Sequence, residues 1–255
     1  LYRVEENGTD KMILDPNTLS EDGTTSLGAI SFSKDGKWMA YQISEGGSDW
    51  RKVKVMDMKA LKETDDEVDW LKFSGMAWYR DGFFYSRYPE SSEDDELSGK
   101  NEFHSLYYHQ LGSPQSEDVL IYKDKDHPLR NVYATMDDSK RFLILSIVES
   151  TSGNGVKVAD LSDGFDDIKF ETIVEDFNND YSYVATANDR MIFMTNKEAP
   201  LQKAVALDVN DLSKGWEEVL AEKENTLRWL ARAGDHFVAG YLKDASSQVQ
   251  VFDLD

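Results

Sequence analysis

The sequence contains no cysteine, which excludes disulfide bonds and zinc sites built on thiolates. Proline is also scarce, with five residues in 255, and no apolar run is long enough to span a bilayer as a helix. No secretory signal is visible at Leu1. These absences do not fix the compartment, because cytoplasmic and periplasmic proteins can both lack cysteine.

Positive charge is in short supply as well. The chain has 28 lysines and arginines against 49 aspartates and glutamates, a net charge of -21. Nucleic-acid binding needs a basic surface, and anionic lipid repels an acidic one. We therefore expect no nucleic-acid partner and no membrane partner, and the simplest meaning of the acidic surface is solubility.

Catalytic motifs are missing too. The sequence has no G-x-S-x-G elbow, no phosphate-binding loop and no dinucleotide fingerprint. The four histidines (His104, His109, His127 and His236) do not fall in a metal-binding spacing. His104 and His109 flank a strand-like run and are interpreted as structural, either solvated or hydrogen-bonded. From its residues, the chain is expected to hold no catalytic group, no metal and no cofactor.

What the sequence does have is short strands rich in aromatic and aliphatic residues. Turn residues separate such runs, which are typical of strands, at 37–44, 83–89, 141–148, 190–195 and 236–242. No amphipathic helix longer than about three turns is visible. The segment 58–71, MKALKETDDEVDWL, is a weak helical candidate but could equally connect strands.

The strands recur as a repeat when they are aligned by their turns. The repeated hairpins are ISFSKDGKWMAYQIS, MAWYRDGFFYSRYP, YATMDDSKRFLILSIV, YVATANDRMIFMTN and LARAGDHFVAGYL. A third strand follows each hairpin and a fourth follows most of them, with a period of about 45–55 residues. Four antiparallel strands per unit predict the blade of a β-propeller. Blades must stack, because a single blade cannot bury both of its faces.

The predicted fold is therefore all-β, a partial β-propeller of about five to six blades. Residues 1–20 are expected to end a first blade, and 225–255 to form an incomplete one. Four full blades are expected between them, at 21–70, 71–125, 126–178 and 179–224. Because the chain begins without Met, inside the strand-like run LYRV, and stops inside a blade, we expect it to be part of a larger ring.

Several longer stretches resemble one peptidase family. They are ILDPNTLSEDGTTSLGAISFSKDGKWMAY (13–41), GSDW (47–50), KFSGMAW (72–78) and LYYHQLGSPQSEDVLIY (106–122). Together they are similar to prolyl oligopeptidase, a serine peptidase in which a seven-bladed propeller is joined to an α/β-hydrolase domain. The resemblance covers essentially the whole chain, and it is closer than that to oligopeptidase B or to the dipeptidyl peptidases.

The resemblance implies an activity and two partners. The family cleaves short peptides on the carboxyl side of proline, and its propeller excludes large folded substrates from the active site. The implied partners are the α/β-hydrolase catalytic domain of the same protein and short proline-containing peptides. The catalytic triad would belong to that domain, so the chain alone is expected to be inactive. The alternative is a stand-alone β-propeller that serves as a protein-interaction scaffold. A coding sequence that continues into a hydrolase domain would decide against it.

The resemblance also implies roles for two loops. Asp49 corresponds to an interface residue that pairs with an arginine of the hydrolase domain, and Trp50 is expected beside it at that interface. Phe73 corresponds to an aromatic residue in the apolar pocket for the substrate residue two positions before the proline. The alternatives are that Trp50 only anchors its own loop and that Phe73 only belongs to the blade core.

Three further positions are expected to contact substrate but depart from the family pattern. Asn131 falls where some members have an apolar residue, Val148 where some have an arginine, and Thr151 where some have a cysteine. The detailed preference of the pocket is therefore not implied by the resemblance.

Overall fold

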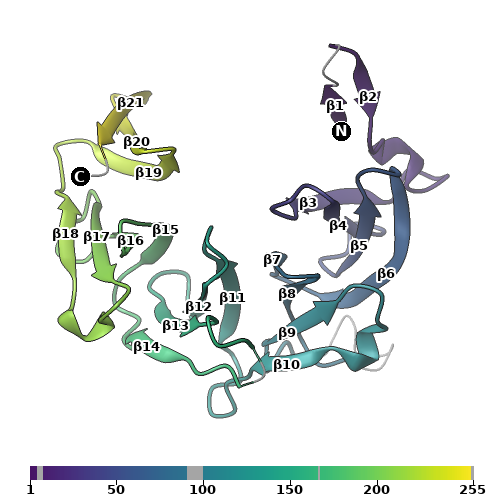
Figure 1. Ribbon diagram of the computed structural model, residues 1–255, viewed down its shortest axis with the longest axis horizontal. Helices are drawn as coiled ribbons and strands as arrows, with labels where there is room; N and C mark the ends of the chain where they lie inside the picture. Colours follow the sequence, from purple (N-terminus) through teal and green to yellow (C-terminus); the bar gives the residue numbers. More distant parts are fainter. Residues whose placement is uncertain (5–7, 91–99, 166, 254–255) are drawn as a thin grey trace. The chain divides into compact units, whose positions relative to one another are not determined.

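The computed structural model describes residues 1–4, 8–90, 100–165 and 167–253, and the described part is built from strands (Figure 1). It contains only short 3-10 turns and no α-helix, which confirms the all-β prediction. In these ranges, no helix is long and apolar enough to cross a membrane. The chain divides into two compact units, Leu1–Ala134 and Thr135–Asp255, which are described separately.

The first unit holds a hairpin and two four-stranded antiparallel sheets. The hairpin pairs β1 (Tyr2–Val4) with β2 (Asp10–Met12), and η1 (Pro16–Thr18) follows it. One sheet has the order β3 (Ser26–Phe32), β4 (Trp38–Ser44), β5 (Arg51–Asp57) and β6 (Lys62–Leu71). The other contains β7 (Ala77–Tyr79), β8 (Gly82–Arg87), β9 (Ser105–Gln110) and β10 (Val119–Tyr122), with η3 (Gln115–Glu117) before its last strand. Each strand pairs with the next one in the chain, as the repeat predicts.

The second unit continues the same pattern. One sheet has the order β11 (Asn131–Met136), β12 (Phe142–Val148), β13 (Gly155–Asp160) and β14 (Glu171–Val174), and its first strand begins before the unit boundary. The next contains β15 (Tyr181–Ala187), β16 (Arg190–Thr195), β17 (Lys203–Asp208) and β18 (Glu217–Leu220), with η4 (Leu212–Lys214) before β18. A three-stranded sheet of β19 (Thr226–Ala233), β20 (His236–Lys243) and β21 (Ser246–Asp253) ends the described part.

Of the segment 58–71, which the sequence left open between helix and strand, residues Lys62–Leu71 form strand β6. Its burial alternates with a period of two: Asp66 and Val68 are buried, whereas Asp65 and Glu67 are exposed. That alternation is what a strand at the edge of a half-buried sheet requires.

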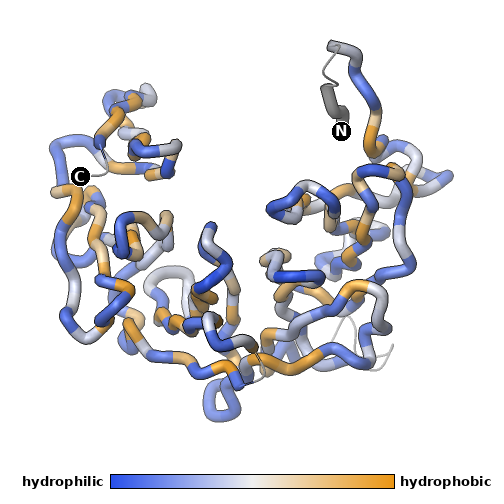
Figure 2. Tube along the Cα trace, viewed as in Figure 1, coloured by the Kyte–Doolittle hydropathy of each residue, from blue (hydrophilic) through white to orange (hydrophobic). Residues whose placement is uncertain are grey.

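The apolar cores lie between neighbouring sheets of a unit. In the first unit, one cluster joins β4–β6 to the residues around β7 and β8, namely Ala40, Val53, Val55, Val68, Leu71, Met76, Trp78, Phe83 and Tyr85. In the second unit, another joins the β12–β14 strands to the β15–β17 strands. Figure 2 shows how apolar and polar stretches are distributed along the chain. Each fully buried side chain of this size stabilises the fold by about 1.5–3 kcal/mol.

A buried group of charges crosses the same sheet-to-sheet contact. His109 on β9 lies between two buried carboxylates: its Nδ1 is 2.8 Å from Asp118 Oδ1 and its Nε2 is 3.3 Å from Asp66 Oδ1. Asp66 lies on β6 of the neighbouring sheet. Tyr85 donates to Asp118, at 2.6 Å, and Thr64 donates to Asp66, at 2.7 Å. The histidine that the sequence suggested to be structural thus links two sheets.

His109 is held in its protonated form. Burial alone would lower its pKa, but the hydrogen bonds to Asp118 and then Asp66 outweigh burial and raise the pKa to about 9. The imidazolium compensates part of the charge of the two carboxylates. Removing it would leave both of them buried without a counter-charge.

We therefore expect His109→Leu to lower the free energy of unfolding of the chain by about 3–5 kcal/mol, as for a broken buried ion pair. Urea unfolding near neutral pH measures this. The control is His236→Leu, because His236 pairs with Asp253 on the surface and its loss should cost about 1 kcal/mol or less. Equal effects of the two substitutions would contradict the assignment.

The same network predicts a pH dependence. A histidine whose pKa is raised on folding stabilises the protein fully below its unfolded pKa, near 6.5, and this stabilisation is lost as pH rises through about 9. The difference in unfolding free energy between the wild type and His109→Leu should therefore narrow between about pH 7 and pH 10. Urea midpoints of both proteins across this range test it, and a constant difference would refute it.

Candidate functional site

The six predicted site residues divide between the two units. Asp49, Trp50, Phe73 and Asn131 belong to the first unit, whereas Val148 and Thr151 belong to the second. The four residues of the first unit are connected through two further side chains, Lys72 and Tyr88. Lys72 Nζ lies 5.6 Å from the centre of the Phe73 ring.

The loop between β4 and β5 carries Asp49 and Trp50. Gly46 and Gly47 have φ of 57° and 74°, a conformation that glycine adopts without strain. Ser44 donates its hydroxyl to the carbonyl of Ser48, at 2.6 Å, and the Trp50 amide donates to the Ser48 hydroxyl, at 3.1 Å. These bonds hold the loop in a compact shape. The Asp49 side chain remains 76% exposed.

Trp50 packs on its own unit. Its ring meets Trp70 edge-on at 5.1 Å between centroids, and Tyr88 at 6.1 Å. Lys72 Nζ lies 5.4 Å from the centre of the Trp50 ring and 3.5 Å from Asp49 Oδ2. The indole therefore anchors its loop locally, while the carboxylate beside it stays accessible.

Phe73 projects from the loop between β6 and β7. Its φ is 57° and its residue is 52% exposed, so it does not fit the alternative of a core residue. An aromatic residue in the left-handed region is strained, and such strain persists where the surroundings fix the backbone. Here Gln42 donates to the Ser74 carbonyl, at 2.7 Å, and the amide of Ser86 donates to the Ser74 hydroxyl, at 2.8 Å. The ring is thus presented to solvent by a fixed loop.

Asn131 joins the same group through Tyr88. The Tyr88 hydroxyl donates to Asn131 Oδ1 at 2.6 Å, and the Tyr88 ring also contacts Trp50. Burial raises the pKa of Tyr88 to about 12, so the hydroxyl remains a donor at neutral pH. A chain of contacts therefore runs from Asp49 and Phe73 through Lys72, Trp50 and Tyr88 to Asn131.

Lys72 and Tyr88 are not among the residues predicted from the sequence, and His104 is predicted from it only as a structural residue. Lys72 directly precedes Phe73, so its place in KFSGMAW was a usable signal. Tyr88 contacts a residue 43 positions away, and no local pattern could have revealed that pairing. His104 contacts the backbone of both Lys72 and Val132, which is also invisible in the sequence.

Val148 and Thr151 lie at the end of β12 and in the loop that follows. Val148 is half-buried and Thr151 is exposed. The far side of this loop is fixed, because the Gly153 amide donates to Asp180 Oδ1 at 2.7 Å. Gly153 has φ of 75°, and a Cβ there would lie 1.8 Å from the carbonyl oxygen of Phe177, so only glycine fits.

The side chains of this group are suited to binding. Within the described ranges, no three His, Cys, Asp or Glu residues are grouped to hold a metal. The ring nitrogens of His109 face two carboxylates, and those of His104 face backbone groups. Neither buried histidine can therefore serve a nucleophile. The group offers an exposed aromatic ring, an exposed carboxylate and an amide.

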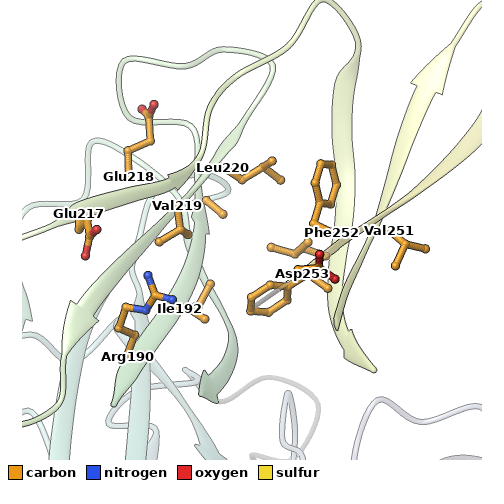
Figure 3. A pocket seen from close by; sticks show the side chains of 12 residues that line it. Arg190, Ile192, Glu217, Glu218, Val219, Leu220, Val251, Phe252 and Asp253 are labelled. Carbon is orange, nitrogen blue, oxygen red and sulfur yellow. The ribbon is translucent and has the colours of Figure 1, made fainter. Parts of the chain in front are cut away.

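The second unit also contains a pocket of about 510 Å³ between the β15–β18 and β19–β21 sheets (Figure 3). Apolar side chains of both sheets line it, with Arg190 and the acidic Glu217 and Asp253 among its polar residues. None of the six predicted residues is among those that line it.

Comparison with known sequences connects this geometry to a family. The family model described as "Prolyl oligopeptidase, N-terminal beta-propeller domain" matches residues 1–255. A prolyl endopeptidase from Elizabethkingia meningoseptica is 38% identical over 255 residues, which cover 99% of this chain and 36% of that protein. Prolyl oligopeptidase A from Galerina marginata is 30% identical, over 99% of this chain and 37% of that protein.

Solved structures agree with the sequences. A structure from an analysis of two prolyl endopeptidases and their inter-domain dynamics superimposes with a TM-score of 0.86 at 32% identity, over 96% of this chain and 35% of that one. Prolyl oligopeptidase B from Galerina marginata, bound to a 35mer hydrolysis and macrocyclization substrate, gives 0.88 at 26% identity, over 98% and 37%. The chain thus spans little more than a third of these relatives. With the family model matched from end to end and the four-stranded sheets shared with these structures, the chain belongs to the prolyl oligopeptidase family, as its N-terminal β-propeller domain.

Proposed function

We propose that this chain is the substrate-gating propeller portion of a prolyl-specific serine endopeptidase, which hydrolyses short peptides after proline. The observation that carries the proposal is the match of the whole chain to the propeller of this family, with relatives named prolyl endopeptidase among the similar sequences. The chain covers about 36% of such a relative. The remaining length leaves room for a catalytic domain.

In this proposal the nucleophile, the base and the oxyanion hole come from an α/β-hydrolase domain of the same protein. Asp49 supports such a partner, because its carboxylate is exposed and its ion pair with Lys72, at 3.5 Å, leaves further acceptor capacity. An arginine of the catalytic domain could approach it from solvent. The chain by itself would be inactive.

The substrate would be a short peptide that contains proline. Phe73 offers an apolar surface for the side chain two positions before the proline, and Asn131 lies in the same contact group as Trp50. We include Val148 and Thr151 as further substrate contacts from the second unit. The blades are proposed as 21–70, 71–125, 126–178 and 179–224, with partial blades at 1–20 and 225–255.

The first experiment compares two preparations, the 255-residue chain of 29.1 kDa and the complete natural protein that contains it. Intact mass identifies each, and a chromogenic Gly-Pro reporter peptide measures cleavage. We expect cleavage by the complete protein only. If a complete protein more than twice the mass of the chain does not cleave after proline, the proposal is wrong. If the natural protein is no longer than the chain, the scaffold function takes its place.

Phe73→Ala in the complete protein should reduce the preference for an apolar residue two positions before the proline. The variant should lose about 1 kcal/mol of contact between the ring and an apolar substrate side chain. The ratio of kcat/KM for Phe-Gly-Pro over Gly-Gly-Pro reporters should therefore fall about five-fold. The ratio cancels differences in the amount of folded enzyme.

Phe32→Ala provides the matched control. Phe32 lies on β3 and is 48% exposed, close to the exposure of Phe73, but the sequence assigns it no contact with substrate. Its removal should leave the reporter ratio unchanged. An equal loss from both variants would place the preference elsewhere.

A further inference from the structure

One buried side chain holds the backbones of both predicted pocket segments of the first unit. His104, directly before β9, is 1% exposed. Its Nε2 lies 2.9 Å from the carbonyl oxygen of Lys72, next to Phe73. Its Nδ1 lies 3.0 Å from the amide of Val132, next to Asn131.

The two contacts define the form of the imidazole. The Val132 amide is a donor, so Nδ1 must be the acceptor and carries no proton. The proton is then on Nε2, which donates to the Lys72 carbonyl. This is a neutral histidine, and burial, only partly opposed by the bond to Lys72, lowers its pKa to about 4. At neutral pH both hydrogen bonds are therefore present together.

The His104 ring also supports the Asn131 side chain, through its contact with Tyr88. Its centroid lies 4.7 Å from that of Tyr88, whose hydroxyl donates to Asn131 Oδ1. His104 thus reaches Asn131 both through the neighbouring Val132 amide and through the Tyr88 ring. It reaches Phe73 through the carbonyl of the preceding residue. The left-handed backbone of Phe73 needs such support, because nothing in its own conformation favours it.

We propose that His104 is a positioning residue that fixes the distance between the Phe73 ring and the Asn131 amide, and so sets the preference for the side chain held between them. The inference rests on the proposed function, because it assigns His104 to the same substrate pocket. A pocket is selective only if its walls stay at a fixed distance from each other. Here the neutral imidazole of His104 would fix the distance between Phe73 and Asn131, through hydrogen bonds to the backbone beside each of them.

Two substitutions remove the two hydrogen bonds of His104 one at a time. His104→Asn keeps an acceptor near the position of Nδ1 but cannot reach the Lys72 carbonyl. His104→Gln keeps a donor near the position of Nε2 but removes the acceptor for the Val132 amide. Each variant loses one buried hydrogen bond, so each should lower stability to a similar extent. They are therefore controls for one another.

The first readout needs no cleavage. Hydrogen–deuterium exchange in the complete natural protein should become faster at residues 73–75 in His104→Asn and faster at Val132 in His104→Gln, in each case about ten-fold or more. If both variants exchange alike at both segments, His104 does not hold them separately and the proposal is overturned. This holds whether or not the protein is a peptidase.

The second readout is the reporter ratio for Phe-Gly-Pro over Gly-Gly-Pro. His104→Asn should reduce it about five-fold, as Phe73→Ala does, and His104→Gln should also reduce it, because the proposed preference needs both segments to be held. If Phe73→Ala changes the ratio and His104→Asn does not, the positioning role is wrong and the pocket stands. If Phe73→Ala has no effect, the proposed pocket itself fails, and exchange alone then decides whether His104 holds the two segments.

Discussion

The inner strands β4, β8, β12 and β16 are buried along most of their length, and the structure depends on covering their faces with neighbouring sheets. A four-stranded antiparallel meander cannot do this by itself, so each repeat requires the next. The first unit meets the requirement with one continuous apolar cluster across two sheets and places His109 and its two carboxylates in the same contact. Apolar packing supplies most of the stability, and the buried charges add hydrogen-bonded contacts between the same two sheets.

The candidate site follows from the same arrangement. The loops at the ends of the strands lie on the surface, and the sheets hold them at defined places. Phe73 and Asp49 are exposed because they lie on such loops, whereas Trp50, Tyr88 and His104 reach inward and anchor them. The exposed groups are suited to contact a partner or a peptide, and the inward groups are suited to keep them in place.

The sequence predicted the fold well because its signals are local. Hairpin turns such as KDG and RDG, and the short apolar and aromatic runs that flank them, appear within about fifteen residues, and the repeat then identifies the blade. Segment 58–71 remained ambiguous because its charges hide the period-two pattern that burial reveals in β6. The closeness of Lys72 to Phe73 follows from the sequence, because the two residues are adjacent in KFSGMAW. The links through Tyr88 and His104 could not, since they join residues 28 to 43 positions apart and depend on how the sheets pack.

The loop after β12 shows how such a site could diversify. Its root at Gly153 admits no side chain at all, because the Phe177 carbonyl occupies that space, whereas Thr151 near its tip is open to solvent. Substitutions at the tip would therefore be tolerated by the fold, while those at the root would not. The side chain at the tip of this loop can thus change during evolution without any change in the sheets. Gly153 is the position beyond which such changes are not tolerated.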